Sequence, residues 1–148
     1  HLELKRYFDI HELLNEHSAD RIFETASGLL QRDEYRVQGL LARMRVQVVC
    51  TTDDPVDSLH YHEQVARQEN GINMFPTFRP DKAYSTKDVT AYNQYLDQLA
   101  QTAGVTIQSL DDVVNALYKR MTYFESFGCR VSDHGLECLD FQPGNANK

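Results

Sequence analysis

The sequence predicts an α/β fold in which short parallel strands are joined by helices. Three short apolar runs have the length and composition of strands, and amphipathic segments with a helical period lie between them. The order strand, helix, strand, two helices, strand is the order that right-handed crossovers between parallel strands produce. Each run ends in a compact polar cluster, and the runs cover residues 46–50, 72–75 and 129–131.

The first 44 residues predict helices throughout. Ser18 is a candidate N-cap for a helix whose apolar residues recur with the 3.6-residue period from Ile22 to Leu30. Upstream, shorter helices are expected with a break near Asp9. Residues 1–44 therefore form a helical prelude to the first strand.

The segments between the strands carry helix signals of their own. Residues 60–69 form a short amphipathic pattern. Two Ser-x-x-Asp sequences, Ser85 to Asp88 and Ser109 to Asp112, are candidate capping boxes for two longer helices, and a glycine suits the end of each. The second of these helices has an apolar stripe made of Leu110, Val113, Val114, Leu117, Met121 and Phe124.

Composition and charge narrow the class of protein. A chain of 148 residues with 41% hydrophobic and 25% charged residues fits one domain with a real core, and no run approaches the roughly 18 apolar residues of a membrane span. A formal net charge of -7 disfavours a nucleic-acid partner, because phosphate binding needs clustered Lys and Arg. Three cysteines without paired spacing predict reduced thiols, and no apolar signal core begins the chain, so we expect a cytoplasmic protein without membrane contact.

The polar clusters at the strand ends are the candidate site, because side chains converge at the C-terminal ends of parallel strands in a barrel. Asp53 and Asp54 follow the first run, and they either cap the next helix from before Pro55 or place a carboxylate in a pocket. Arg79 follows the second run. Because Pro80 favours an extended Arg79, its guanidinium either reaches a substrate carboxylate or pairs with a loop acid.

The third cluster places Asp133 and His134 just beyond the last run. Adjacent side chains on an extended segment face opposite ways, so one of the two faces the pocket. Asp133 is either an acid or base, or a holder of a substrate hydroxyl, or a turn residue before Gly135. The pair His60 and His62 has the spacing of a metal site on a strand, but on a helix the two diverge by about 200°.

Four stretches together resemble the uronate isomerase family, also called glucuronate isomerase. The similarity runs in order from the first residue to about Cys138, with similar helical segments between the motifs, and no single motif would suffice. The four stretches are His1-Leu2-Glu3-Leu4-Lys5-Arg6-Tyr7-Phe8, Thr51-Thr52-Asp53-Asp54-Pro55-Val56-Asp57-Ser58-Leu59-His60-Tyr61-His62, Phe78-Arg79-Pro80-Asp81-Lys82 and Ser132-Asp133-His134-Gly135-Leu136-Glu137.

The resemblance implies a distorted (β/α)8 TIM barrel of the amidohydrolase superfamily, with a helical insertion near its start. It implies reversible aldose–ketose isomerisation in hexuronate catabolism, from D-glucuronate to D-fructuronate and from D-galacturonate to D-tagaturonate. It further implies that Arg79 contacts the sugar acid and that Asp133 lies in the same pocket as Arg79. Asp133 is the candidate catalytic residue. Asp53, Asp54 and His134 are the other candidate substrate-binding residues.

The chain also departs from this family. Members carry an H-x-H motif on the first strand and a late Asp that bind a divalent metal, which we expect to be zinc, and neither region is present here. A barrel needs about 250 residues, and this chain offers three strands. We therefore expect a middle fragment, without a metal of its own and inactive alone, in which residues 1–44 are the helical insertion, 45–141 a partial barrel and 142–148 a flexible tail.

Open strand edges and a partly uncovered apolar face favour self-association, so we expect a homo-oligomer. Two alternatives stay open. One is a non-catalytic interaction module that uses the helices of residues 1–44 as its binding surface. The other is a small autonomous metal enzyme that uses His60, His62 and Asp133.

Overall fold

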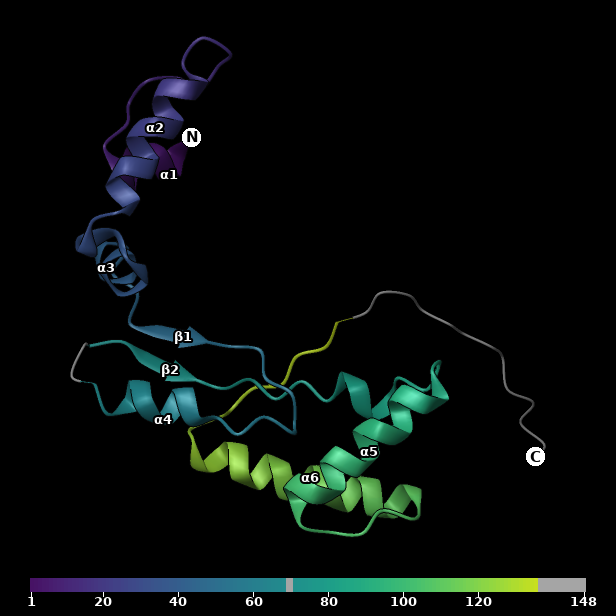
Figure 1. Cartoon of the computed structure of the whole chain (residues 1–148). Helices are drawn as coiled ribbons and strands as arrows, with labels where there is room; N and C mark the ends of the chain where they lie inside the picture. The colour runs from purple at the N-terminus through teal and green to yellow at the C-terminus, as the bar shows by residue number, and fades with distance from the viewer. Residues whose placement is uncertain (69–70, 136–148) are drawn as a thin grey trace, which may run out of the picture. The chain divides into compact units, whose positions relative to one another are not determined.

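The computed structural model describes residues 1–68 and 71–135 and has an α/β fold (Figure 1). The predicted tail, residues 142–148, lies outside the described residues. Contacts divide the chain into two compact units, residues 1–49 with 64–74, and residues 50–63 with those from 75 onward. The elements in chain order are α1 (Leu2–Phe8), α2 (Ala19–Leu30), η1 (Asp33–Tyr35), α3 (Val37–Arg43), β1 (Val48–Cys50), α4 (His60–Ala66), β2 (Asn73–Phe75), η2 (Asp81–Tyr84), α5 (Val89–Ala103) and α6 (Leu110–Ser126).

The strands β1 and β2 lie side by side in a two-stranded parallel sheet. Their pairing continues past both strand ends, because the amide of Asp53 donates to the carbonyl of Thr77 (3.0 Å) and the amide of Arg79 donates to the carbonyl of Asp53 (2.9 Å). The expected third strand is wrong as a full element, since it is reduced to one parallel bridge between Phe78 and Ser132. Three chain segments nevertheless lie next to one another, with Phe78, three residues after β2, in the middle.

The two faces of this arrangement differ. Asp53, Phe78 and Ser132 are bridged in register, so their side chains share one face, and the residues that follow them face the other way. Phe78 packs edge-on against Phe124 of α6, with ring centroids 5.1 Å apart, which identifies its face as the helix-covered one. Arg79 and Asp133 therefore project from the opposite face.

Two apolar clusters hold the second unit together. One joins Phe78 and Phe124 to Leu59, and the other packs α5 against α6. The predicted stripe on α6 is only partly correct: Val114 and Met121 are 58% and 50% exposed. The face that is actually buried consists of Val113, Ala116, Arg120 and Phe124.

The predicted N-caps of the helices can be compared with the observed helix ends. The capping box of Ser109 and Asp112 is confirmed, with both reciprocal hydrogen bonds present. The box proposed for Ser85 is wrong, because α5 begins three residues later with Asp88 as its N-cap. Ser18 does stand at the N-cap of α2, but its hydroxyl donates to the carbonyl of Leu13 (2.6 Å) instead of capping the helix.

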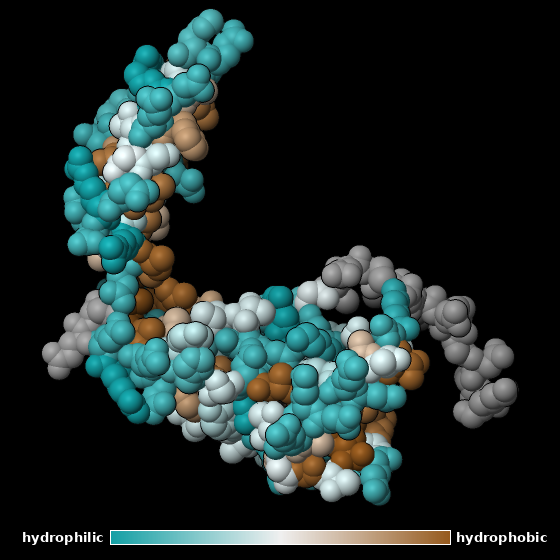
Figure 2. Space-filling view, in the orientation of Figure 1, coloured by the Kyte–Doolittle hydropathy of each residue, from teal (hydrophilic) through white to brown (hydrophobic). Residues whose placement is uncertain are grey.

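The first unit buries few of its apolar side chains. Ile22 and Tyr35 are buried, whereas Phe23 and Val37 are each 74% exposed. Figure 2 shows hydrophobic residues at the surface of these helices, next to hydrophilic ones. No helix in the described ranges is long and apolar enough to cross a membrane.

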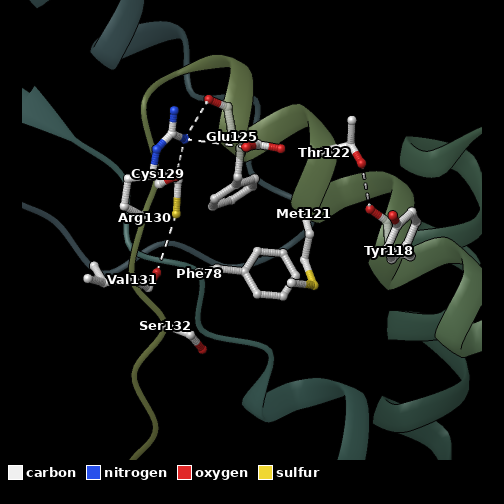
Figure 3. Close-up of a pocket in the computed structure, with 10 residues that line it drawn as sticks. Phe78, Tyr118, Met121, Thr122, Glu125, Cys129, Arg130, Val131 and Ser132 are labelled. Carbon is white, nitrogen blue, oxygen red and sulfur yellow. Dashed lines mark hydrogen bonds and ion pairs between the residues drawn. The ribbon is translucent and has the colours of Figure 1, made fainter.

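A groove of about 380 Å³ lies on the second unit between α6 and residues 129–132 (Figure 3). Phe78 lines it, together with Tyr118, Met121 and Phe124 of α6. Its remaining lining residues are Thr122, Glu125, Cys129, Arg130, Val131 and Ser132. The groove thus combines apolar side chains with the polar residues Thr122, Glu125 and Arg130.

Candidate functional site

Arg79 and Asp133 form a two-point ion pair on the side of the paired segments that faces away from Phe124. The Nε of Arg79 donates to Oδ1 of Asp133 (3.0 Å), and Nη2 donates to Oδ2. The hydrogen bond to Asp133 raises the pKa of Arg79 further above its ordinary value. Their side chains are 36% and 38% exposed, so the pair stays open to solvent and to a ligand. The loop acid that pairs with Arg79 is therefore Asp133.

Asp81, in η2, collects three hydrogen bonds on one carboxylate. Its Oδ1 accepts from the hydroxyl of Tyr84 (2.5 Å) and from Nδ1 of His134 (2.9 Å), and its Oδ2 accepts from the amide of Gly135 (2.7 Å). These hydrogen bonds lower the pKa of Asp81 to about 2, and the bond from Tyr84 has the largest effect. The same bond raises the pKa of Tyr84. Asp81 therefore ties η2 to the loop after the third segment.

Gly135 connects these two groups into one cluster. A Cβ at this position would lie 3.3 Å from Oδ2 of Asp81 and 4.0 Å from Nη1 of Arg79. The absence of a side chain at Gly135 thus lets both charged groups approach the same backbone segment. We call Arg79, Asp81, Tyr84, Asp133 and His134 the polar cluster.

Asp54 lies at the edge of the polar cluster. Its Oδ2 is 3.3 Å from Nζ of Lys82, the residue after Asp81, and its Oδ1 accepts from the hydroxyl of Tyr95 (3.1 Å). Burial, followed by the nearby Asp54 carboxylate, raises the pKa of Tyr95. Asp54 also orders a turn through its backbone carbonyl, which accepts from the amide of Asp57 (2.9 Å). It caps this turn and not a helix, since α4 begins only at His60.

Asp53 faces the helix-covered side and does not reach the polar cluster. Its Oδ2 accepts from the hydroxyl of Thr51 (2.6 Å) and lies 3.7 Å from Nε2 of His62, which is 2.7 Å from the same hydroxyl. Both side chains are largely buried, at 13% and 6% exposure. The expectation that Asp53 shares one pocket with Arg79 and Asp133 is not supported by these contacts, although the three backbones are neighbours.

The two histidines of α4 are not brought together with Asp133. His60 Nδ1 lies 3.0 Å from the hydroxyl of Ser58, and His62 is held by Thr51. Among residues 1–68 and 71–135, no group of three or more His, Cys, Asp or Glu side chains is arranged to hold a metal ion. The alternative of a small metal enzyme needs a metal site made of His60, His62 and Asp133, and the residues described do not form such a site.

Arg120 of α6 is a structural residue that the sequence patterns missed. It is only 7% exposed, and its guanidinium donates to the carbonyls of Pro55 (2.6 Å) and Asp57 (2.9 Å) while it stacks 4.1 Å above the ring of Tyr123. Tyr123 in turn donates to the carbonyl of Ser58 (2.5 Å). Burial lowers the pKa of Arg120. The helix thus clamps the loop that follows Asp54.

Asp81 and Tyr84 were missed as site residues as well, and their signals differ. Asp81 stands two residues after Arg79, so its place at the strand end could have drawn attention to it. Tyr84 gives no such signal. Arg120 follows Ala116 by one helical turn on the buried face of α6, and a polar residue on that face is a sign of a specific contact.

Comparison with known proteins identifies the family. The family model for glucuronate isomerase matches residues 1–148. Among curated proteins, the uronate isomerase of Flavobacterium johnsoniae is 44% identical over 142 residues, covering 96% of this chain and 30% of that protein. The uronate isomerase of Opitutus terrae is 45% identical over 148 residues, covering 100% of this chain and 31% of that protein.

Solved structures agree with this result. The crystal structure of uronate isomerase from Thermotoga maritima superposes with a TM-score of 0.82 at 35% identity, covering 90% of this chain and 29% of that one. The glucuronate isomerase from Caulobacter crescentus gives a TM-score of 0.80 at 25% identity, covering 89% of this chain and 27% of that one. The chain spans less than a third of the length of these relatives, in agreement with the expected fragment of a longer enzyme. In both sequence and fold, the chain belongs to the glucuronate isomerase family.

Proposed function

We propose that the whole protein containing this chain is a uronate isomerase that interconverts D-glucuronate with D-fructuronate and D-galacturonate with D-tagaturonate. Family membership supports the reaction class. The single structural observation that carries the proposal is the open ion pair of Arg79 and Asp133. A guanidinium held at two points by one carboxylate is oriented for a second, incoming carboxylate.

Arg79 would bind the carboxylate of the hexuronate, and Asp133 would hold Arg79 in place or contact a substrate hydroxyl. The isomerisation removes a proton from C2, passes through an enediolate and returns a proton to C1, so it needs a positioned acid or base near the bound sugar. Asp133 is the catalytic candidate of this chain. His134 and Asp54 border the same region as substrate-binding candidates, whereas the contacts of Asp53 give it a supporting place behind the strands.

We further propose that this chain is part of a (β/α)8 barrel, with the strands β1 and β2 and the third segment as three neighbouring strands. Their parallel pairing and the helices between them support this fold. A divalent metal, zinc, would be held by the H-x-H motif on the first strand and the late Asp that the family carries, which belong to regions of the whole protein outside this chain. The isolated chain would therefore be inactive.

The remaining proposals concern partners and location. The sugar acid is the proposed ligand, and neither nucleic acid nor a membrane is a proposed partner, in keeping with the acidic net charge. Exposed Tyr118 and Met121 in the groove support self-association of the isolated chain and a homo-oligomer. Cys50 and Cys129 are free thiols, which is in keeping with a cytoplasmic location.

The test is isomerase activity of the whole protein with D-glucuronate and D-galacturonate, with the isolated chain measured beside it. We expect turnover by the whole protein alone. Arg79→Ala should lower kcat/KM by roughly 100-fold, the loss expected for a charge-assisted contact to the substrate carboxylate. The matched control is Arg36→Ala, which removes an exposed arginine paired with Asp33 and should leave kcat/KM unchanged. Absence of uronate turnover by the whole protein would refute the proposed function.

A further inference from the structure

The three donors around Asp81 determine where the hydrogens of its neighbours lie. An ionised carboxylate only accepts hydrogen bonds, and the low pKa of Asp81, about 2, keeps it ionised near neutral pH. The hydroxyl of Tyr84 lies 2.5 Å from Oδ1 of Asp81 and 3.3 Å from Nδ1 of His134, so its single hydrogen goes to the nearer and ionised acceptor, Oδ1 of Asp81. Because Asp81 can only accept, the Nδ1 of His134 must carry a hydrogen.

A neutral imidazole carries one hydrogen, so the hydrogen on Nδ1 leaves Nε2 of His134 with a free lone pair. The side chain of His134 is 49% exposed, and Nε2 makes no hydrogen bond within the described part of the chain. His134 therefore offers a fixed hydrogen-bond acceptor to a ligand. Without Asp81, either ring nitrogen could carry the hydrogen.

This acceptor is part of the same cluster as a cationic donor. Gly135, which follows His134, donates its amide to Oδ2 of Asp81 (2.7 Å), and a Cβ at Gly135 would lie 4.0 Å from Nη1 of Arg79. A sugar acid carries an anionic carboxylate, which suits Arg79, and hydroxyl groups that need acceptors, which suit Nε2 of His134. Arg79 uses one acceptor site on each oxygen of Asp133, so His134 adds a second acceptor beside that ion pair.

We propose that Asp81 is a positioning residue that fixes the Nδ1-protonated tautomer of His134, so that Nε2 accepts a hydroxyl hydrogen of the hexuronate whose carboxylate Arg79 binds. The part of this proposal that concerns the ligand rests on the proposed function. The part that concerns the tautomer rests on the contacts of Asp81 alone. Gly135 contributes by donating its amide to the second oxygen, which keeps the carboxylate facing His134.

The tautomer is measured by long-range 1H–15N correlation spectra of the 15N-labelled chain, recorded at a pH where histidines are neutral. The wild-type chain should show His134 with the hydrogen on Nδ1. Asp81→Ala should move the tautomer ratio by at least about tenfold toward Nε2-H, the effect of one lost charge-assisted hydrogen bond. Asp81→Asn keeps an acceptor oxygen and should retain the Nδ1-H form.

Two controls separate positioning from a general loss of structure. Asp97→Ala removes an exposed carboxylate from α5 and should change no histidine signal. His62, which is held by Thr51, serves as an internal reference and should keep its signals in every variant. A wild-type His134 with its hydrogen on Nε2 would overturn the proposal, as would an unchanged ratio in a folded Asp81→Ala chain. If Asp81→Ala loses the His62 signals as well, that variant has lost its fold. The tautomer of His134 in the wild-type and Asp81→Asn spectra then decides whether the proposal holds.

The ligand part is tested in the whole protein by steady-state kinetics with D-glucuronate. Asp81→Ala should raise KM by about tenfold. Asp81→Asn should have a KM much closer to that of the wild type, and Asp97→Ala should have the wild-type KM. An unchanged KM in Asp81→Ala would overturn the ligand part. If the whole protein has no isomerase activity, the proposed function fails while the tautomer result stands. If activity is present but the tautomer is wrong, only this inference fails.

Discussion

Replacing Arg120 by methionine tests whether α6 holds the loop after β1. Methionine has a similar length and no charge, so Arg120→Met removes the two hydrogen bonds to the carbonyls of Pro55 and Asp57 and leaves the packing largely filled. Each bond from a charged donor contributes about 1.5 to 3 kcal/mol, and the burial of the guanidinium offsets part of this sum. We expect the free energy of unfolding to fall by about 2 to 3 kcal/mol.

The assay is urea unfolding of the chain followed by far-UV circular dichroism. The matched control is Arg130→Met, because Arg130 belongs to the same unit, is 68% exposed and should change the free energy of unfolding by less than about 0.5 kcal/mol. Arg120→Lys keeps the charge but not the planar fork and should fall between the two. If Arg120→Met were no less stable than Arg130→Met, α6 would not stabilise the loop through this arginine.

Four further outcomes are expected. Ser109→Ala removes the confirmed capping box of α6 and should cost about 1 kcal/mol in urea unfolding, while no loss would mean that the box contributes nothing. The pKa of Asp81 is lowered from 3.8 to about 2, so its hydrogen bond to the amide of Gly135 should persist above pH 3.8 and be lost as the pH falls through about 2. This is followed as the amide proton shift of Gly135, and a midpoint near 3.8 would contradict the contact. Gly135→Ala brings a Cβ to 3.3 Å from Asp81 and should weaken the same bond, seen as an upfield shift of that amide. Finally, light scattering should give a mass above the 17.1 kDa of one chain, and Met121→Lys in the groove should lower it, whereas a monomer at all micromolar concentrations would exclude self-association.

The features that could be predicted from the sequence are those set by neighbouring residues. The capping box at Ser109 and the end of α5 at Gly104 depend on a few adjacent residues, and both occur where the sequence places them. The strand ends were also located, because an apolar run followed by polar residues marks them directly. Arg79 and Asp133 were named as candidates for this reason, and the structure brings them together.

The side of the sheet on which a residue lies could not be predicted. Asp53 and Asp54 are adjacent, and a shift of one residue in register exchanges their faces. Only the bridge from Asp53 to Phe78, whose ring packs on Phe124, assigns Asp53 to the helix side. The contacts of Asp81 could not be predicted either, because they join η2 to residues far along the chain. His134, for example, lies 53 positions after Asp81.

The apolar stripe of α6 failed for a different reason. Periodicity counts apolar residues and so ranked Val114 and Met121 above Arg120. In the folded chain, carbonyls of the loop need donors, and a buried arginine supplies them at a place where an apolar side chain would leave them unpaired. The position of Arg120 was set by the loop and not by the helix.

The clamp on the loop after β1 acts on main-chain atoms. Arg120 and Tyr123 bind the carbonyls of Pro55, Asp57 and Ser58, which every amino acid possesses. These three hydrogen bonds are therefore independent of the side chains at the positions they bind, and the shape of the loop should survive exchange of the side chain at Ser58. Single substitutions in the loop after β1 can therefore change the side chains that lie next to the polar cluster. Meanwhile Arg120 and Tyr123 of α6, which are distant in sequence, keep the backbone of the loop in place.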